Sequence, residues 1–144
     1  MTAGKVDAGV VRRHLLALHA ALVALEPHTG KALRALDATE ERWIVERGLQ
    51  LAAQNVLDVA THLVAGAGRD APDYAGAIDQ LGVLGVVPPE FAAQLRGLAG
   101  FRNVLVHEYV EIDTHLVYVN LQSGIADLQA YARSLALWLQ VQEA

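Results

Sequence analysis

The sequence predicts an all-α protein, an up-and-down bundle of four long helices with one short extra helix. Two observations predict this class. Apolar residues recur at helical spacing in each long segment, and no segment keeps the two-residue alternation of a β-strand for long. Proline and glycine fall between these segments, where helices begin and end. We expect residues 1–144 to form a single helical domain, because a chain of this length can bury one core.

The first expected helix covers residues 7–25, and Pro27 stops it because proline cannot continue a helix. Its apolar positions recur three or four residues apart: Val10, Val11, Leu15, Leu18, Leu22 and Leu25. Residues 28–36 are ambiguous and form either a short helix or an irregular crossover. A long helix then runs to about Ala65, with Asp37 or Thr39 as its expected cap.

Polar side chains recur every four residues along this long helix and form one narrow stripe: Glu46, Gln50, Gln54 and Asp58. Residues four apart share a helix face. The stripe is either a solvated edge or a surface that supports a site from behind. Under the second interpretation, Gln54 and Asp58 are the supporting candidates.

The second half of the chain is also expected to be helical. A third helix covers residues 74–84, and a fourth begins at residues 88–90, where proline suits the first turn and Glu90 its positive end. Residues 110–113 connect it to a last helix, residues 114–142, which Gly124 is expected to bend. The fourth helix carries one apolar face: Phe91, Leu95, Leu98, Phe101 and Leu105.

Composition limits the classes of function. Hydrophobic residues make up 53% of the chain and charged residues 19%, so we expect a homodimer that hides apolar surface. The net charge of −5 argues against a broad basic surface for nucleic acid, but it allows a local cationic site. Without cysteine, the chain has no disulfide or thiolate metal site, which fits a reducing cytoplasm. No uninterrupted apolar run reaches about 18 residues, so we expect no membrane span.

The most reactive side chains lie together in residues 101–109. Arg102 can hold a phosphate with a planar fork of donors, and His107 can move a proton near neutral pH. Asn103 lies four residues before His107, hence on the same helix face, and can orient its imidazole. Tyr109 can donate a hydrogen bond or accept a covalent group. We therefore take Arg102 and His107 as candidate catalytic residues, with Asn103 and Tyr109 supporting them.

The spacing of this motif sets a geometric condition. In a regular helix, five residues separate the azimuths of Arg102 and His107 by roughly 140°. Both side chains reach one phosphate only if the helix ends or distorts near Val106, or if Arg102 of one subunit works with His107 of another. We prefer the second arrangement, in which a two-fold dimer forms one shared cleft.

The same motif resembles the signature of the HEPN superfamily and, within it, the HepT-type toxins. The resemblance extends over residues 5–140 and includes four further stretches: residues 41–42, 49–51, 54–58 and 73–75. It implies a metal-independent endoribonuclease without a cofactor, the toxin of a type VII-like toxin–antitoxin pair. The partner it implies is a minimal nucleotidyltransferase antitoxin, which neutralises the toxin by nucleotidylylation of Tyr109. RNA is the implied substrate, cut by attack of the 2′-hydroxyl with help from His107 and Arg102.

Other interpretations of these residues remain open. The chain is alternatively a non-catalytic HEPN-like partner, or a nucleotide-binding subunit, of a nucleotidyltransferase. Arg102 could pair with an acidic residue on another helix, and His107 could cap a helix end. The remaining histidines are expected at the surface or in packing: His14, His19, His28, His62 and His115. We expect no metal site.

Overall fold

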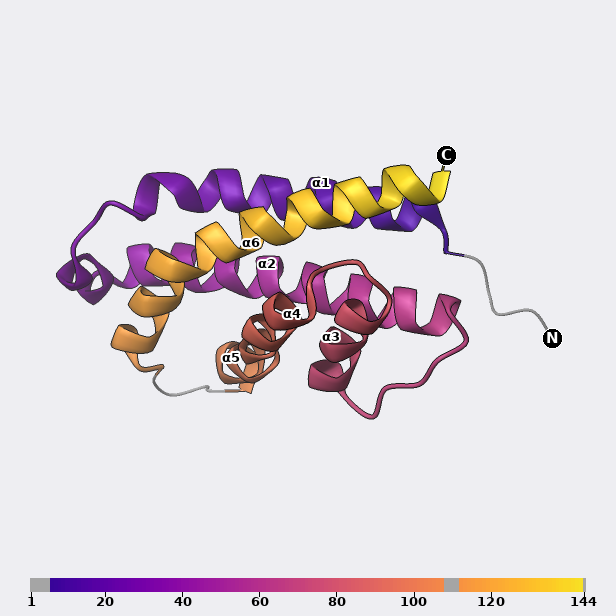
Figure 1. The fold of residues 1–144 in the computed structure, drawn as a ribbon. Helices are drawn as coiled ribbons and strands as arrows, with labels where there is room; N and C mark the ends of the chain where they lie inside the picture. The colour runs from indigo at the N-terminus through magenta and orange to yellow at the C-terminus, as the bar shows by residue number, and fades with distance from the viewer. Residues whose placement is uncertain (1–5, 108–111, 144) are drawn as a thin grey trace.

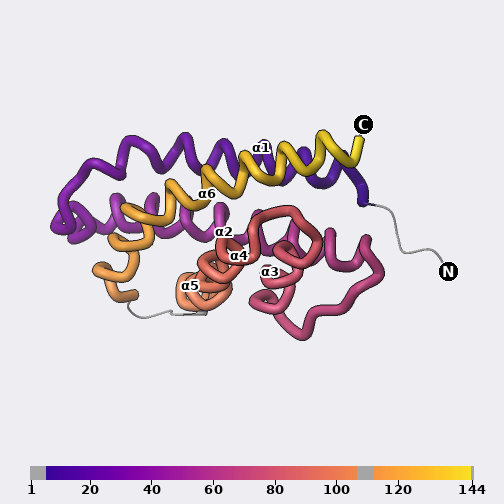
Figure 2. Tube along the Cα trace, in the orientation of Figure 1, coloured from indigo at the N-terminus to yellow at the C-terminus, as the bar shows by residue number. Residues whose placement is uncertain are grey.

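The computed structural model describes residues 6–107 and 112–143, and the regular elements in these ranges are all helical (Figure 1). Three helices are long: α1 (Ala8–Leu25), α2 (Thr39–Gly66) and α6 (Thr114–Glu143). They pack against one another, with α1 antiparallel to both α2 and α6 (Figure 2). The predicted all-α class is confirmed.

Three short helices cover the side of α2 that faces away from α1: α3 (Tyr74–Val83), α4 (Pro89–Leu95) and α5 (Gly97–His107) (Figure 1). The expected fourth long helix is therefore divided at Arg96. Beyond it, the amide of Ala99 turns to the carbonyl of Arg96 at 3.2 Å instead of continuing the α-helical pattern. Gly97 and Gly100 weaken the helix at this point, because glycine costs about 1 kcal/mol in a helix interior relative to alanine.

Local signals fix the ends of the helices. The carboxylate of Asp7 accepts from the amides of Gly9 and Val10 and caps α1. Residues 28–36, left open above, lie in and between two 3₁₀ turns, Glu26–His28 and Leu33–Asp37. The predicted cap of α2 is wrong, because its N-cap is Ala38, without a side-chain hydrogen bond. The preceding 3₁₀ turn already occupies Asp37, and Thr39 lies within the helix.

The core lies where the helices meet, and 31 buried hydrophobic residues from the whole described length form one cluster. The crossing of α1 and α2 is especially close. A Cβ atom at Gly48 would lie 2.5 Å from a methyl group of Leu25, which is fully buried. Any larger residue at position 48 would therefore force the buried side chain of Leu25 to shift.

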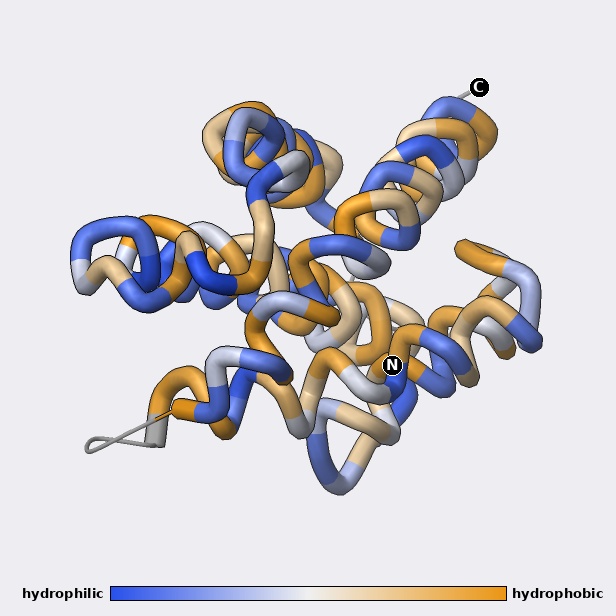
Figure 3. Tube along the Cα trace, turned by 90° about the vertical axis from the view of Figure 1, so that its left-hand side faces the viewer, coloured by the Kyte–Doolittle hydropathy of each residue, from blue (hydrophilic) through white to orange (hydrophobic). Residues whose placement is uncertain are grey.

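Short hydrophobic and hydrophilic stretches follow one another along the helical turns (Figure 3), as is typical of amphipathic helices. Helix α6 also changes direction in its first part (Figure 1). Near the predicted bend at Gly124, Asn120 and Ser123 donate to the carbonyls of Leu116 and Val119, a pattern that often bends helices. The bend therefore has a cause besides glycine.

The segment Ala8–His28 is long and apolar enough to cross a membrane by length and composition alone. Such a match is weak evidence, because core helices of soluble proteins pass the same test. Arg12 and Arg13 interrupt the segment, and α1 packs against α2 and α6. The absence of a membrane partner stays a prediction.

Candidate functional site

Arg102 lies in α5 and points toward α2, where it meets the polar stripe. Its Nε donates to Oε1 of Gln54 at 2.7 Å, and Nε2 of Gln54 donates to Oδ1 of Asp58, also at 2.7 Å. All three side chains are half-buried. Of the two interpretations of the stripe, these contacts favour the one in which Gln54 and Asp58 support the motif from behind.

Two further side chains hold the guanidinium of Arg102. Nη1 donates to Oδ1 of Asn103 at 3.2 Å, and Cζ lies 5.6 Å from the centre of the Tyr74 ring. A cation over an aromatic face is stabilised by about 0.5–1 kcal/mol at a partly exposed site. Among the described residues, Nη2 has no hydrogen-bond partner. Gln54, Asn103 and the Tyr74 ring thus hold the guanidinium through Nε, Nη1 and one face. Its outer edge, at Nη2, can donate hydrogen bonds to an anion.

One open interpretation was that Arg102 pairs with an acidic residue on another helix. The structure instead shows the amide of Gln54 as its partner. No described acidic residue forms an ion pair with it. Asp58 is reached only through Gln54. The contacts of Arg102 with Gln54 and Asn103 therefore orient the guanidinium, and no carboxylate in residues 6–107 or 112–143 neutralises its charge.

The structure describes α5 as helical through His107, one residue beyond Val106, so a helix end close to Val106 and a site shared between two subunits both stay open. The side chain of His107 and the whole of Tyr109 lie outside the described residues. Their placement relative to Arg102 stays a prediction. Asn103, expected to orient the imidazole, is exposed and contacts Arg102.

The other end of the polar stripe is separate from this site. Glu46 lies 3.8 Å from Arg42 within α2. Burial raises the pKa of Glu46, and the positive charge of Arg42 offsets only part of that rise. The carboxylate of Glu46 therefore interacts with Arg42 in the same helix and takes no part in holding Arg102.

Three of the remaining histidines have structural partners. Nδ1 of His14 lies 2.8 Å from Oδ1 of Asn55, and Nδ1 of His28 lies 2.6 Å from Oε1 of Glu41. Nε2 of His62 accepts from the amide of Asp7. Within residues 6–107 and 112–143, no group of His, Cys, Asp and Glu could hold a metal ion.

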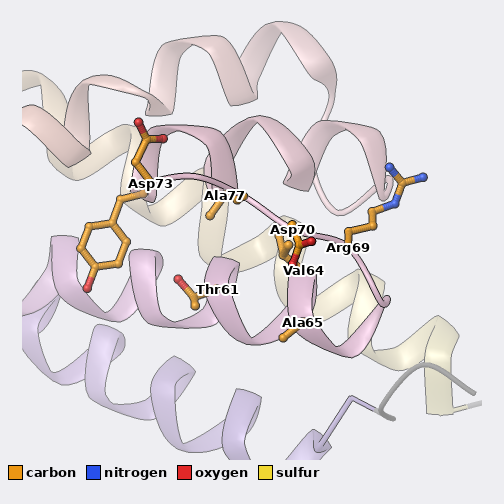
Figure 4. A pocket seen from close by; sticks show the side chains of 9 residues that line it. Thr61, Val64, Ala65, Arg69, Asp70, Asp73 and Ala77 are labelled. Carbon is orange, nitrogen blue, oxygen red and sulfur yellow. The ribbon is translucent and has the colours of Figure 1, made fainter. Parts of the chain in front are cut away.

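A cavity of about 430 Å³ lies between the end of α2 and the start of α3, and we call it the α2–α3 pocket (Figure 4). It shares Tyr74 with the Arg102 site. The sequence did not indicate this pocket, because Tyr74 and the residues before it carried no motif of a binding site. Its lining combines apolar and polar side chains: Thr61, Val64, Ala65, Arg69, Asp70, Ala71, Asp73, Tyr74 and Ala77.

Comparison with known proteins gives consistent results. Residues 18–135 match the family described as Ribonuclease HepT-like. The tRNA nuclease HepT of Aphanizomenon flos-aquae is 31% identical over 106 residues, which cover 72% of this chain and 71% of that protein.

Solved structures share the fold. YutE of Bacillus subtilis, a cytosolic protein of unknown function, superposes with a TM-score of 0.82 at 20% identity, over 99% of this chain and 95% of that one. A tri-AMPylated HEPN toxin of Shewanella oneidensis, in complex with MNT antitoxin, gives 0.79 at 15% identity, over 89% and 97%.

The fold is therefore that of the HEPN toxins. With the match over residues 18–135 and the 31% identical relative, the chain belongs to the HepT-like ribonuclease family.

Proposed function

We propose that this protein is a metal-independent endoribonuclease and the toxin of a toxin–antitoxin pair. The observation that carries the proposal is Arg102, which is oriented by Gln54, Asn103 and Tyr74 and keeps its outer edge available. The tRNA nuclease among its relatives supports RNA as the substrate.

The chemistry needs a base and a cation. His107 takes the proton of a 2′-hydroxyl, and the freed oxygen attacks the adjacent phosphorus. The bond from phosphorus to the 5′-oxygen breaks, and that oxygen takes a proton from water. The products are a 2′,3′-cyclic phosphate and a 5′-hydroxyl. General base catalysis contributes about 10²–10⁴-fold, and Arg102 stabilises the charge that develops on the phosphate oxygens.

A homodimer completes the site in this proposal. Arg102 and His107 lie five residues apart on α5, and on a regular helix this spacing favours pairing Arg102 of one subunit with His107 of another. Beside the motif, a groove of about 520 Å³ runs between α5 and α6. Gly97, Gly100 and Gly124 line it with open space above their Cα atoms, so a second backbone can approach closely.

Neutralisation by a minimal nucleotidyltransferase antitoxin is the second part of the proposal. The HEPN toxin of Shewanella oneidensis is AMPylated and bound to MNT antitoxin, which supports such a partner here. Tyr109 is the proposed acceptor. A nucleotide on it would place a negative phosphate beside the cleft, where it would repel RNA and occupy Arg102.

The test is cleavage of a tRNA pool by unmodified protein, with and without a chelator. We expect cleavage in both, and loss of at least about 10²-fold in His107→Ala and Arg102→Lys. Lysine keeps the charge but cannot donate to Gln54 and Asn103 with a fork. The matched controls, His115→Ala and Arg133→Lys, change exposed residues of α6 and should cut normally. Binding of RNA or nucleotide without any cleavage would overturn the proposal and favour the non-catalytic partner.

A further inference from the structure

The α2–α3 pocket and the Arg102 site meet at one aromatic ring. Tyr74 lines the pocket, and the guanidinium of Arg102 lies 5.6 Å from the centre of the same ring. A phosphate held by Arg102 would therefore lie close to the Tyr74 wall of the pocket. The base and phosphate of one nucleotide are separated by a single sugar, so a nucleotide can span this distance.

The walls of the pocket favour a flat apolar group. Four apolar side chains line it, namely Val64, Ala65, Ala71 and Ala77, together with the ring of Tyr74. Its volume of about 430 Å³ lies within the range of about 300–1,000 Å³ found for small-molecule sites. Single-stranded RNA is commonly recognised by unstacked bases that lie against aromatic side chains.

The polar groups of the pocket are mainly acceptors. Asp70 carries a carboxylate, and Thr61 uses its hydroxyl proton on the carbonyl of Leu57, which leaves its oxygen as an acceptor. Arg69 donates to Oε1 of Gln80, and Figure 4 shows its guanidinium extended away from Thr61. Asp73 accepts from the amide of Gly76 as the cap of α3. Such a lining disfavours a phosphate and suits a ligand that donates hydrogen bonds.

We propose that the α2–α3 pocket binds a nucleobase with an exocyclic amino group, from the nucleotide whose phosphate lies on Arg102. Cytosine offers its 4-amino group to Asp70, whereas uracil presents a carbonyl oxygen at that position. Adenine and guanine also carry amino groups. This inference rests on the proposed ribonuclease function, since it assigns a base preference to the same site.

The binding test compares short oligo(C) and oligo(U), which differ at the group that Asp70 would contact. The protein carries His107→Ala, so that the RNA stays intact. We expect oligo(C) to bind about five- to tenfold more tightly, the effect of one typical hydrogen bond at an exposed carboxylate. Asp70→Asn should remove this preference, because an amide can also donate to the uracil carbonyl. Asp37→Asn, an exposed acid in the turn before α2, should keep it.

The cleavage test fills the pocket. Ala65→Leu adds apolar volume at a helical position that lines it, and Ala136→Leu makes the same change on α6. In RNA of mixed sequence, we expect cuts beside amine-bearing bases, with this preference reduced about fivefold by Ala65→Leu and unchanged by Ala136→Leu. Equal binding of both oligomers, or a preference that survives Asp70→Asn, overturns the base site.

The two proposals fail separately. Cleavage without any base preference leaves the ribonuclease intact and removes the pocket inference. A preference for oligo(C) that depends on Asp70, in a protein that never cuts RNA, keeps the base site and removes the nuclease.

Discussion

Nε of Arg102 donates to Oε1 of Gln54 at 2.7 Å, across 48 residues of sequence. Glutamine is neutral, so this contact fixes the direction of the guanidinium without neutralising its charge. A carboxylate in the same place would fix the direction equally well but would compete with a phosphate for the charge.

Gln54→Glu should therefore lower RNA cleavage while keeping the fold. The new carboxylate pairs with Arg102 and weakens its attraction for the phosphate, so we expect kcat/KM to fall about tenfold or more. The measurement is steady-state cleavage beside thermal unfolding. Gln50→Glu, one turn earlier on the same stripe, is the matched control. Equal effects of the two changes would contradict the role given to Gln54.

Gly100→Leu tests the dimer. In the single chain nothing lies within 4 Å of a Cβ at this position, so leucine costs the protomer no clash and improves helix propensity. In a dimer that packs through the α5–α6 groove, the same side chain blocks the partner. We expect analytical ultracentrifugation to show a monomer. A cleavage assay of the same variant should show little RNA cleavage.

Ala136→Leu places the same side chain on α6 outside the α5–α6 groove and should leave the dimer intact. A Gly100→Leu protein that remains dimeric and active would remove this groove as the interface.

Gly48→Ala should destabilise the fold. The added Cβ would lie 2.5 Å from a methyl group and 2.8 Å from Cγ of Leu25. Overpacking of this kind costs about 1–3 kcal/mol of unfolding free energy, which urea titration can measure. In the background of Leu25→Ala, which makes room, adding Gly48→Ala should cost much less. An equal cost in both backgrounds would show that the clash is not the cause.

Acid stability should depend on Glu41. The hydrogen bond from His28 is the main cause that holds the pKa of Glu41 below its usual 4.5, and Lys31 adds to it. An acid with a lowered pKa stabilises the fold while it is charged. This contribution is fully present above pH 4.5 and disappears as the pH falls through the lowered pKa.

Unfolding free energies measured from pH 7 down to the acid limb check this prediction. Glu41→Gln should be less stable than the parent at neutral pH, and the difference should shrink below pH 4.5. Glu40→Gln, its exposed neighbour, should follow the parent at every pH. A difference that stays constant with pH would exclude the ionised pair as its source.

Sequence periodicity predicted the helices well because amphipathic spacing is a local signal. The first helix and the one over residues 74–84 begin at the expected residues or one position away. The break at Arg96 was missed because a continuous apolar face spans it. Similarly, the four-residue spacing pointed to Gln54 before any contact was known.

The contacts of Tyr74 could not be predicted in this way. Its ring meets Arg102 only because α3 and α5 both pack against α2. No helical periodicity around Tyr74 indicates that its ring contacts Arg102. The pocket beside it likewise forms only where the end of α2 meets the loop before α3 and the first turn of α3.

The support of Arg102 also has a consequence for synthesis in the cell. Gln54, Tyr74 and Arg102 come from three separate segments, and the last of them leaves the ribosome long after the first. No truncated product that lacks α5 can assemble this cation. The proposed ribonuclease activity therefore requires the chain to be made and folded at least through α5.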